Sequence, residues 1–203
     1  MDMSIAEVVS IAKDVFLAAA AATTAVVAIL GLNKWSKELR GKANFEVAKE
    51  LLKATYHLRD AIDRCRSPWI DGSEFPEGYK IGNNDPKTEG QAYVHVFSKR
   101  LKPIYTALQH FDSLVLEAEA LWGGAIREKA NEFRHCVRIL EVDIETMIED
   151  KFRGGELFKD RNFARQIRSS VFNTKSKDNE LTKKIEASIQ ALEDEIRPHL
   201  SRK

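Results

Sequence analysis

The sequence predicts an all-α protein in which an N-terminal transmembrane helix precedes an antiparallel helical bundle of about four helices. Three observations lead to this fold. An uncharged apolar run lies near the N-terminus, several later segments repeat apolar residues at helical spacing, and no segment sustains the alternation typical of a strand. With 203 residues, of which 43% are hydrophobic and 31% charged, the chain has room for one membrane helix and one packed domain.

The apolar run extends from Val15 to Leu32 and contains no charged residue. Its eighteen residues meet the usual minimum for a spanning helix, although they cover only about 27 Å of a roughly 30 Å hydrocarbon core. Ser4 and Glu7 form a capping box, so the helix is expected to begin near residue 4. We therefore predict a short non-cytoplasmic N-terminus at 1–14 and a transmembrane helix at 15–33.

Cations gather directly after this run. Trp35 lies where an interfacial aromatic residue belongs, and the basic juxtamembrane linker 34–43 carries Lys34, Lys37, Arg40 and Lys42. By the positive-inside rule, these cations keep the C-terminal domain cytoplasmic and leave the acidic N-terminus outside. The predicted location is the bacterial inner (plasma) membrane, with a single pass, and the same cations could hold anionic lipids of the bilayer.

Two other interpretations of the run remain open. A cleaved signal peptide needs a basic start, whereas residues 1–14 carry three acidic residues and one lysine. A helix buried within a soluble oligomer fits the alanine-rich composition. Small residues four apart, as in Ala18 with Ala22, would also permit close packing between two copies, so self-association is a possible partnership.

The bundle domain is predicted at 44–203, after a helix break at Gly41. Helical spacing over 44–66 places one set of residues on a common face: Val47, Leu51, Ala54, Leu58, Ala61 and Cys65, widened by Phe45, Ala48, Leu52 and Tyr56. The segment 67–90 is rich in Pro, Gly, Asp and Asn and has no period, which indicates a long exposed loop.

Thr88 and Gln91 form a second capping box, which is expected to begin the next helix. Its apolar seam comprises Phe97, Leu101, Ile104, Leu108, Phe111, Val115 and Ala118. Pro103 lies inside this seam and is expected to kink or split the helix, because it removes a backbone donor. Gly123 and Gly124 end the helix.

Two further seams follow. The first, which stops at Gly154 and Gly155, comprises Phe133, Val137, Leu140, Ile144 and Met147. Residues 156–173 have weak helical character, with Leu157, Phe158, Phe163, Ile167, Val171 and Phe172 available to cover the edge of a core. The last helix is expected from about Asp178 until Pro198 closes it, with a seam of Leu181, Ile185, Ile189, Leu192 and Ile196.

Charge and cysteine content narrow the function. Residues 34–203 contain 31 basic and 28 acidic residues, a balance of +3 that is too weak for nucleic-acid binding. Cys65 and Cys136 form no CxxC motif, so neither a disulfide framework nor a zinc site is indicated. The sequence contains no phosphate-binding loop, dinucleotide fingerprint, HExxH or GxSxG motif. We expect no cofactor and no catalytic residue.

Glu132 and His135 have the spacing that carboxylate-bridged metal bundles use. Such sites require a second copy of the motif and two more glutamates, and only Glu117 and Glu119 on the preceding helix are available. A membrane-associated enzyme or metal protein centred on these residues is the alternative hypothesis, and a solvated helix face is the simpler interpretation.

Charged residues crowd two places that a bundle could bring together. Arg59, Asp60 and Arg66 lie at the end of the first soluble helix, and Glu117 and Glu119 lie near the end of the second. Charge runs of this kind are usually solvated helix faces with pairs at i,i+4. The other interpretation is an interior polar network that joins Arg59 or Arg66 to one of the two glutamates.

Four strings carry a resemblance to known proteins: Gly31-Leu-Asn-Lys-Trp-Ser-Lys-Glu-Leu-Arg-Gly41, Leu51-Leu-Lys-Ala-Thr-Tyr-His-Leu-Arg-Asp-Ala61, Arg66-Ser-Pro68 and Leu116-Glu-Ala-Glu-Ala-Leu-Trp-Gly123. Over about residues 25–125 the chain resembles a group of uncharacterised bacterial proteins with one N-terminal membrane helix and a helical remainder. The resemblance implies the same topology. That group has no assigned activity, so no site residues are transferred.

The leading hypothesis is a membrane-anchored helical interaction or scaffold protein, with a protein partner or a second copy as its ligand. The loop at 67–90, with Trp69 and Tyr79, and the Arg/Glu face are its candidate contact surfaces. The membrane-associated enzyme or metal-binding bundle and the soluble helical oligomer are its alternatives.

Overall fold

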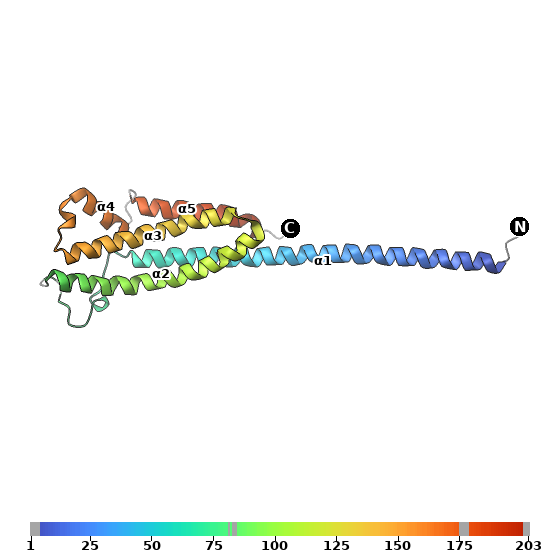
Figure 1. The fold of residues 1–203 in the computed structure, drawn as a ribbon, viewed down its shortest axis with the longest axis horizontal. Helices are drawn as coiled ribbons and strands as arrows, with labels where there is room; N and C mark the ends of the chain where they lie inside the picture. The colour runs from blue at the N-terminus through green and yellow to red at the C-terminus, as the bar shows by residue number, and fades with distance from the viewer. Residues whose placement is uncertain (1–4, 81, 83–84, 175–178, 201–203) are drawn as a thin grey trace. The chain divides into compact units, whose positions relative to one another are not determined.

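The computed structural model describes residues 5–80, 82, 85–174 and 179–200, with side chains in the first helix from residue 13 onward. Every regular element among these residues is helical, which confirms the all-α prediction (Figure 1). The main helices are α1 (Ile5–Cys65), α2 (Pro86–Trp122), α3 (Ala125–Phe152), α4 (Arg161–Val171) and α5 (Glu180–Ile196). Short 3₁₀ turns cover Gly72–Glu74, Leu157–Lys159 and Arg197–Leu200.

The chain divides into two compact units between Ala43 and Asn44, the residue at which the sequence placed the start of the bundle. The helix break expected at Gly41 is absent, because α1 continues through this glycine to Cys65. A single exposed glycine costs about 1 kcal/mol of helix stability relative to alanine, and good helix formers such as Leu39 and Arg40 surround it. The predicted juxtamembrane linker is therefore helical.

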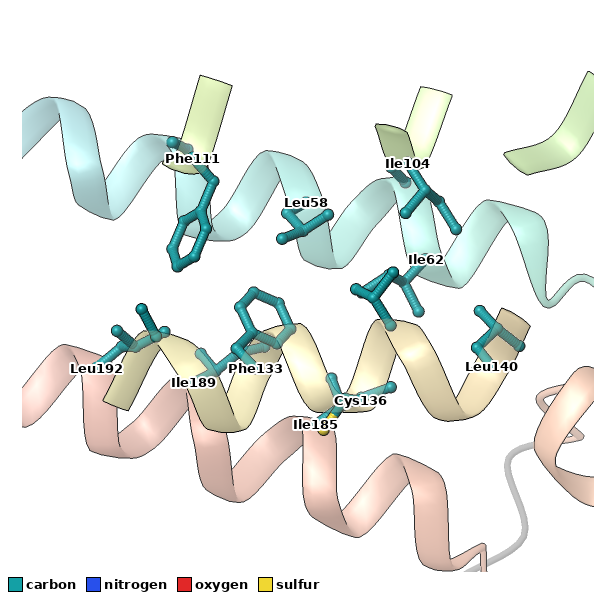
Figure 2. Close-up of a cluster of buried hydrophobic side chains, with 14 of the residues drawn as sticks. Leu58, Ile62, Ile104, Phe111, Phe133, Cys136, Leu140, Ile185, Ile189 and Leu192 are labelled. Carbon is teal, nitrogen blue, oxygen red and sulfur yellow. The ribbon is translucent and has the colours of Figure 1, made fainter. Parts of the chain in front are cut away.

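In the second unit, the Asn44–Cys65 part of α1 forms a bundle with α2, α3 and α5, whose directions alternate along the chain (Figure 1). One continuous cluster of buried apolar side chains contains residues from all five helices. Figure 2 shows Leu58 and Ile62 of α1 opposite Phe133 of α3. The rings of Phe111 and Phe133 meet edge to face at 5.8 Å, which ties α2 to α3 in the middle of the core.

The predicted seams form this core. In α3 and α5 every predicted seam residue is buried, and in α2 only Leu101 and Leu108 are partly exposed. In α1 the predicted face is buried from Leu51 to Cys65, while Val47 is partly exposed. The weakly helical segment becomes α4, which buries Ile167 and Val171 and packs on α3.

Two helix starts differ from the sequence expectation. Asp85 caps α2, because its carboxylate accepts hydrogen bonds from the backbone N–H groups of Lys87 and Thr88 at 3.0 and 3.1 Å. Thr88 is therefore not the cap, and its hydroxyl donates to Asp85. Asn179 caps α5, whereas Asp178 lies outside the described residues, as does Ser4 of the first predicted capping box.

Pro103 does not split α2, which remains one helix from Pro86 to Trp122. The proline side chain is exposed, so its ring displaces no residue of the core. Figure 1 shows α2 curving along its length, which is the ordinary accommodation of a missing backbone hydrogen bond.

Gly90 of α2 lies in close contact with Phe152 of α3. It is buried beneath the ring of Phe152, and a Cβ atom built on it would overlap that ring. We predict that Gly90→Ala lowers the free energy of unfolding by about 1 kcal/mol, because overpacking costs about 1–3 kcal/mol and only part returns as helix propensity. Thermal unfolding followed by circular dichroism should show a midpoint lower by about 2–4 °C.

Gly72→Ala is the matched control, since no atom lies within 4 Å of the added Cβ and its φ is not positive. Its midpoint should stay within error of the unaltered protein. A Gly90→Ala protein as stable as that control would show that the two helices are not in close contact at this position.

Candidate functional site

The apolar run of α1 is exposed along its whole length. Eight large side chains are between 55% and 78% exposed: Val15, Phe16, Leu17, Val26, Val27, Ile29, Leu30 and Leu32. The best 18-residue window reaches a mean hydropathy of 2.3 with none of it buried, so by length and composition this helix could cross a membrane. A soluble monomer rarely leaves so long an apolar surface in water.

The predicted interfacial residues follow on the same helix. Lys34, Lys37, Arg40 and Lys42 are all exposed, and Trp35 is 62% exposed. At about 1.5 Å per residue, the four cations occupy roughly 12 Å of the helix axis. They therefore form a compact basic collar at the end of the apolar run.

Arg66 is a fully buried guanidinium group directly after α1. Its Nε donates to the carbonyl oxygen of Ser170 at 2.7 Å, and its Nη1 donates to the hydroxyl of Thr182 at 3.1 Å. Its Nη2 donates to Ser169 O at 3.3 Å and to Asn179 Oδ1 at 3.1 Å. The end of α1 is thus joined to the end of α4 and the start of α5.

Each of these four acceptors is neutral, and burial lowers the pKa of Arg66 while the nearby Asp63 opposes that shift. The backbone completes the connection, because Asn173 N–H donates to Arg66 O at 2.7 Å. A buried cation of this kind is retained only where every donor finds an acceptor. Arg66 therefore fixes where α4 and α5 must lie.

The acidic partners that the sequence suggested for this network are wrong. Arg59 donates to its neighbour Asp60 at 2.8 Å, and Glu119 pairs with Arg127 at 3.3 Å. Glu117 is exposed on α2. A buried polar network does exist at Arg66, but its acceptors come from the C-terminal third of the chain.

The segment expected to be a long exposed loop is shorter, because α2 already begins at Pro86, and its residues 67–74 are held by hydrogen bonds. Arg100 of α2 holds it: Nη1 donates to Ser67 O at 2.8 Å, Nη2 to Trp69 O at 2.6 Å, and Nε to Glu74 Oε2 at 2.6 Å. The same guanidinium reaches Cys65 O at 3.2 Å, which satisfies a carbonyl at the end of α1.

The two aromatic residues proposed as loop contacts differ. Trp69 is 76% exposed and remains a candidate contact residue. Tyr79 is half-buried, stacks on Phe75 with ring centroids 4.5 Å apart, and donates to Glu89 Oε2. Tyr79 therefore has a structural role in fixing the loop.

The geometry gives the metal hypothesis no support. Glu132 and His135 are exposed on α3, as is Glu117 on α2. Within the described part of the chain, no group of three or more histidine, cysteine, aspartate or glutamate side chains could hold a metal ion.

Two open grooves on the bundle carry cations that form no ion pair within the described part of the chain. The first, of about 650 Å³, lies along α4 and is lined by Arg161, Arg165 and Arg168 together with Pro68, Phe158, Ala164, Ser169, Phe172 and Thr174. The second, of about 590 Å³, lies between α1 and α2 and is lined by Arg64, Lys99 and Lys102 together with His57, Ala61, Pro103, Thr106, Ala107 and His110. We call these the α4 groove and the α1/α2 groove.

Sequence reasoning missed the α4 groove, although a signal was present. Residues 151–177 contain eight basic and two acidic residues, a balance of +6 in a chain whose total is +1. Taking the charge balance over all of residues 34–203 concealed this segment. A window of helix length would have found it.

Comparisons with known proteins found no matching family model, no matching curated protein and no matching solved structure. The resemblance noted in the sequence therefore stays a prediction. Function is inferred from the exposed apolar helix and the charged surfaces of the bundle.

Removing Arg66 tests the network at the end of α1. We predict that Arg66→Ala lowers the free energy of unfolding by about 3–5 kcal/mol, because two buried and two partly buried acceptors lose their donor. The free energy of unfolding of Arg66→Lys should lie between those of the unaltered chain and Arg66→Ala, because an ammonium group keeps the charge but cannot reproduce the planar fork of the guanidinium. Urea unfolding of the full chain in detergent measures both.

Arg64→Ala is the matched control, because Arg64 is exposed only two residues away. Its effect should stay within about 0.5 kcal/mol. Equal losses at positions 64 and 66 would show that the network does not hold the bundle together.

The thiols provide a pH-dependent test. Burial raises the pKa of Cys65 to about 11 against the weaker opposing effect of Arg100 and Arg66, and burial also raises the pKa of Cys136. At pH 8 only about 0.1% of Cys65 is thiolate, so a thiol reagent should label neither cysteine until urea unfolds the protein. Rapid labelling of the folded chain at pH 8 would contradict this.

The raised pKa of Cys65 also predicts the direction of the stability change. The folded state holds this proton up to about pH 11, whereas an unfolded thiol loses it near 9.0. The contribution of the Cys65 thiol to the free energy of unfolding is therefore complete below pH 9 and is lost as the pH rises toward 11. Urea unfolding at several pH values would measure this loss.

Proposed function

We propose that this chain is a membrane-anchored helical interaction protein with its bundle on the cytoplasmic side of a bacterial inner membrane. The observation that supports the anchor is that the bundle core is complete within the second unit, while the apolar run stays exposed. The eight large apolar side chains would contribute roughly 2.5–5 kcal/mol to insertion, which is favourable but modest.

The basic collar supports the orientation. Lys34, Lys37, Arg40 and Lys42 directly follow the apolar run, while Lys13 and Asp14 precede it without net charge. A cationic flank remains on the cytoplasmic side, and Trp35 suits the headgroup region beside it. The bundle that follows at Asn44 would then lie in the cytoplasm, which also suits two free buried cysteines.

An interaction role is favoured over catalysis by what the bundle exposes. Its buried or nearly buried guanidinium groups, Arg66 and Arg100, are used in structural networks, whereas its surface carries two cation-lined grooves and the exposed Trp69. Unpaired charge and exposed aromatic surface are features of binding sites rather than of reaction centres.

A single substitution tests the anchor. Thr24 lies near the middle of the apolar run, and Thr24→Asp adds about 2.5–3.5 kcal/mol to the cost of insertion, which nearly cancels the gain. The unaltered chain should stay in the membrane pellet after alkaline carbonate extraction, and the Thr24→Asp protein should lose the membrane fraction. Thr24→Val is the control and should remain in the pellet.

Cysteine labelling of intact cells tests the orientation, because both native thiols are buried. A membrane-impermeant maleimide should label Ser10→Cys and leave Ser98→Cys unlabelled until the cells are lysed. Release of the unaltered chain by carbonate would instead support the soluble oligomer, and labelling at position 98 in intact cells would reverse the orientation.

A further inference from the structure

We propose that the α4 groove docks an acidic peptide segment of a partner protein, in which carboxylates pair with Arg161, Arg165 and Arg168. This inference names the partner chemistry for the interaction role above and rests on it. The three arginines are spaced at i, i+4 and i+7 on α4, so they share one helix face and extend over about 10 Å of its axis.

The charge of these arginines is not cancelled within the chain. All three are exposed, and none of them forms an ion pair with a carboxylate in the part of the chain that the structure describes. Asp160, the nearest acidic residue in sequence, instead caps α4 by accepting from the backbone N–H groups of Asn162 and Phe163. The guanidinium groups therefore face solvent with their donors available.

The buried Arg66 adds to the positive potential. Its Nη2 donates to Ser169 O, and Ser169 itself lines the groove, so a fourth guanidinium lies directly behind the groove wall. An arginine with only neutral acceptors keeps its full charge, and in a poorly solvated position this charge acts over a longer range. The groove is thus basic on its surface and beneath it.

The groove also has an apolar part. Phe158, Phe172 and Pro68 contribute to its lining, and the guanidinium carbon of Arg168 lies 5.4 Å from the ring centroid of Phe158. Stacking of this kind holds an arginine side chain in place for paired hydrogen bonds to a carboxylate. A ligand with both carboxylates and apolar side chains fits such a surface, as a peptide does.

A nucleic acid fits less well. Residues 44–203 contain 27 basic and 27 acidic residues, so removal of the +6 segment at 151–177 leaves a balance of −6 on the remainder. A long polyanion would be repelled wherever it extends beyond α4, whereas a short acidic peptide contacts only the basic segment.

A membrane surface also fits less well. Within the bundle, α4 packs at the end away from Asn44, which is the residue that continues into the proposed anchor (Figure 1). The Asn44–Cys65 part of α1 spans about 30 Å between these two ends. The basic collar, which directly follows the apolar run, already supplies cations for lipid headgroups, so that role does not need the arginines of α4.

The α1/α2 groove provides an internal comparison. It has a similar volume and also carries three cations, but two of them are lysines and its floor consists of Ala61, Pro103 and Ala107. Lysine offers no planar fork for a carboxylate, and the rings that line this groove are the imidazoles of His57 and His110, with no phenylalanine among them. A comparison of variants in the two grooves therefore distinguishes specific recognition of the peptide from simple attraction to positive charge.

The test measures peptide binding by the full chain in a non-ionic detergent. The probe is a fluorescently labelled octapeptide of alternating glutamate and leucine, followed by fluorescence anisotropy at low salt. We expect the unaltered chain to bind the peptide saturably. The triple variant Arg161→Gln, Arg165→Gln, Arg168→Gln should have a dissociation constant at least tenfold higher. The control variant Arg64→Gln, Lys99→Gln, Lys102→Gln should bind within about twofold of the unaltered chain.

Arg168→Lys should weaken binding although the charge is unchanged, and a glutamine–leucine octapeptide should not bind. Equal losses in both triple variants would overturn the proposal, because attraction would then follow net charge alone. It would also be overturned if single-stranded RNA or anionic vesicles bound more tightly than the peptide, or if the unaltered chain did not bind the peptide. Circular dichroism of each variant confirms that the bundle is folded.

The outcome does not depend on the anchor, since detergent-solubilised protein binds the peptide whether or not the native chain spans a membrane. If the chain does not bind the peptide but stays in the membrane pellet after carbonate extraction, only the proposal of an acidic peptide partner is contradicted. Carbonate release with intact peptide binding would remove only the anchor.

Discussion

The bundle depends on the need to satisfy one buried cation. Arg66 ends α1 inside the protein, where a guanidinium group without acceptors would be too costly to retain. Its acceptors are backbone carbonyls at the end of α4 and side chains at the start of α5, more than a hundred residues away in sequence. Folding must therefore bring the end of α4 and the start of α5 to the end of α1.

A second arginine does the same for the other connection. Arg100 donates to the carbonyl groups of Cys65, Ser67 and Trp69 and to the carboxylate of Glu74, so residues 65–74 are held against α2. Cations beside the C-terminus of a helix are also favoured by its dipole. Ser169, which lines the α4 groove, and Ser67, which precedes the lining residue Pro68, are both held by these arginines, and such preorganisation of the backbone favours affinity.

Local patterns in the sequence were sufficient for the core and insufficient for its polar connections. The seams of α3 and α5 could be predicted because each residue sits at helical spacing within one segment. The partners of Arg66 could not, because backbone carbonyls of Ser169 and Ser170 carry no signal in a sequence and glutamates looked like better acceptors. The helix break predicted at Gly41 was wrong for a related reason. The low helix propensity of glycine is a weak local preference, which neighbouring helix formers overcome.

The opposite end of the bundle is closed by neutral contacts, which gives the domain two chemically different ends. Trp122 stacks on His199 with centroids 4.0 Å apart and donates from Nε1 to Asn44 Oδ1 at 3.3 Å. Burial lowers the pKa of His199, so this ring is neutral at physiological pH and adds no charge beside Asn44. At the α4 end, by contrast, three exposed arginines form no ion pair within the described part of the chain, so their charge is available for recognition.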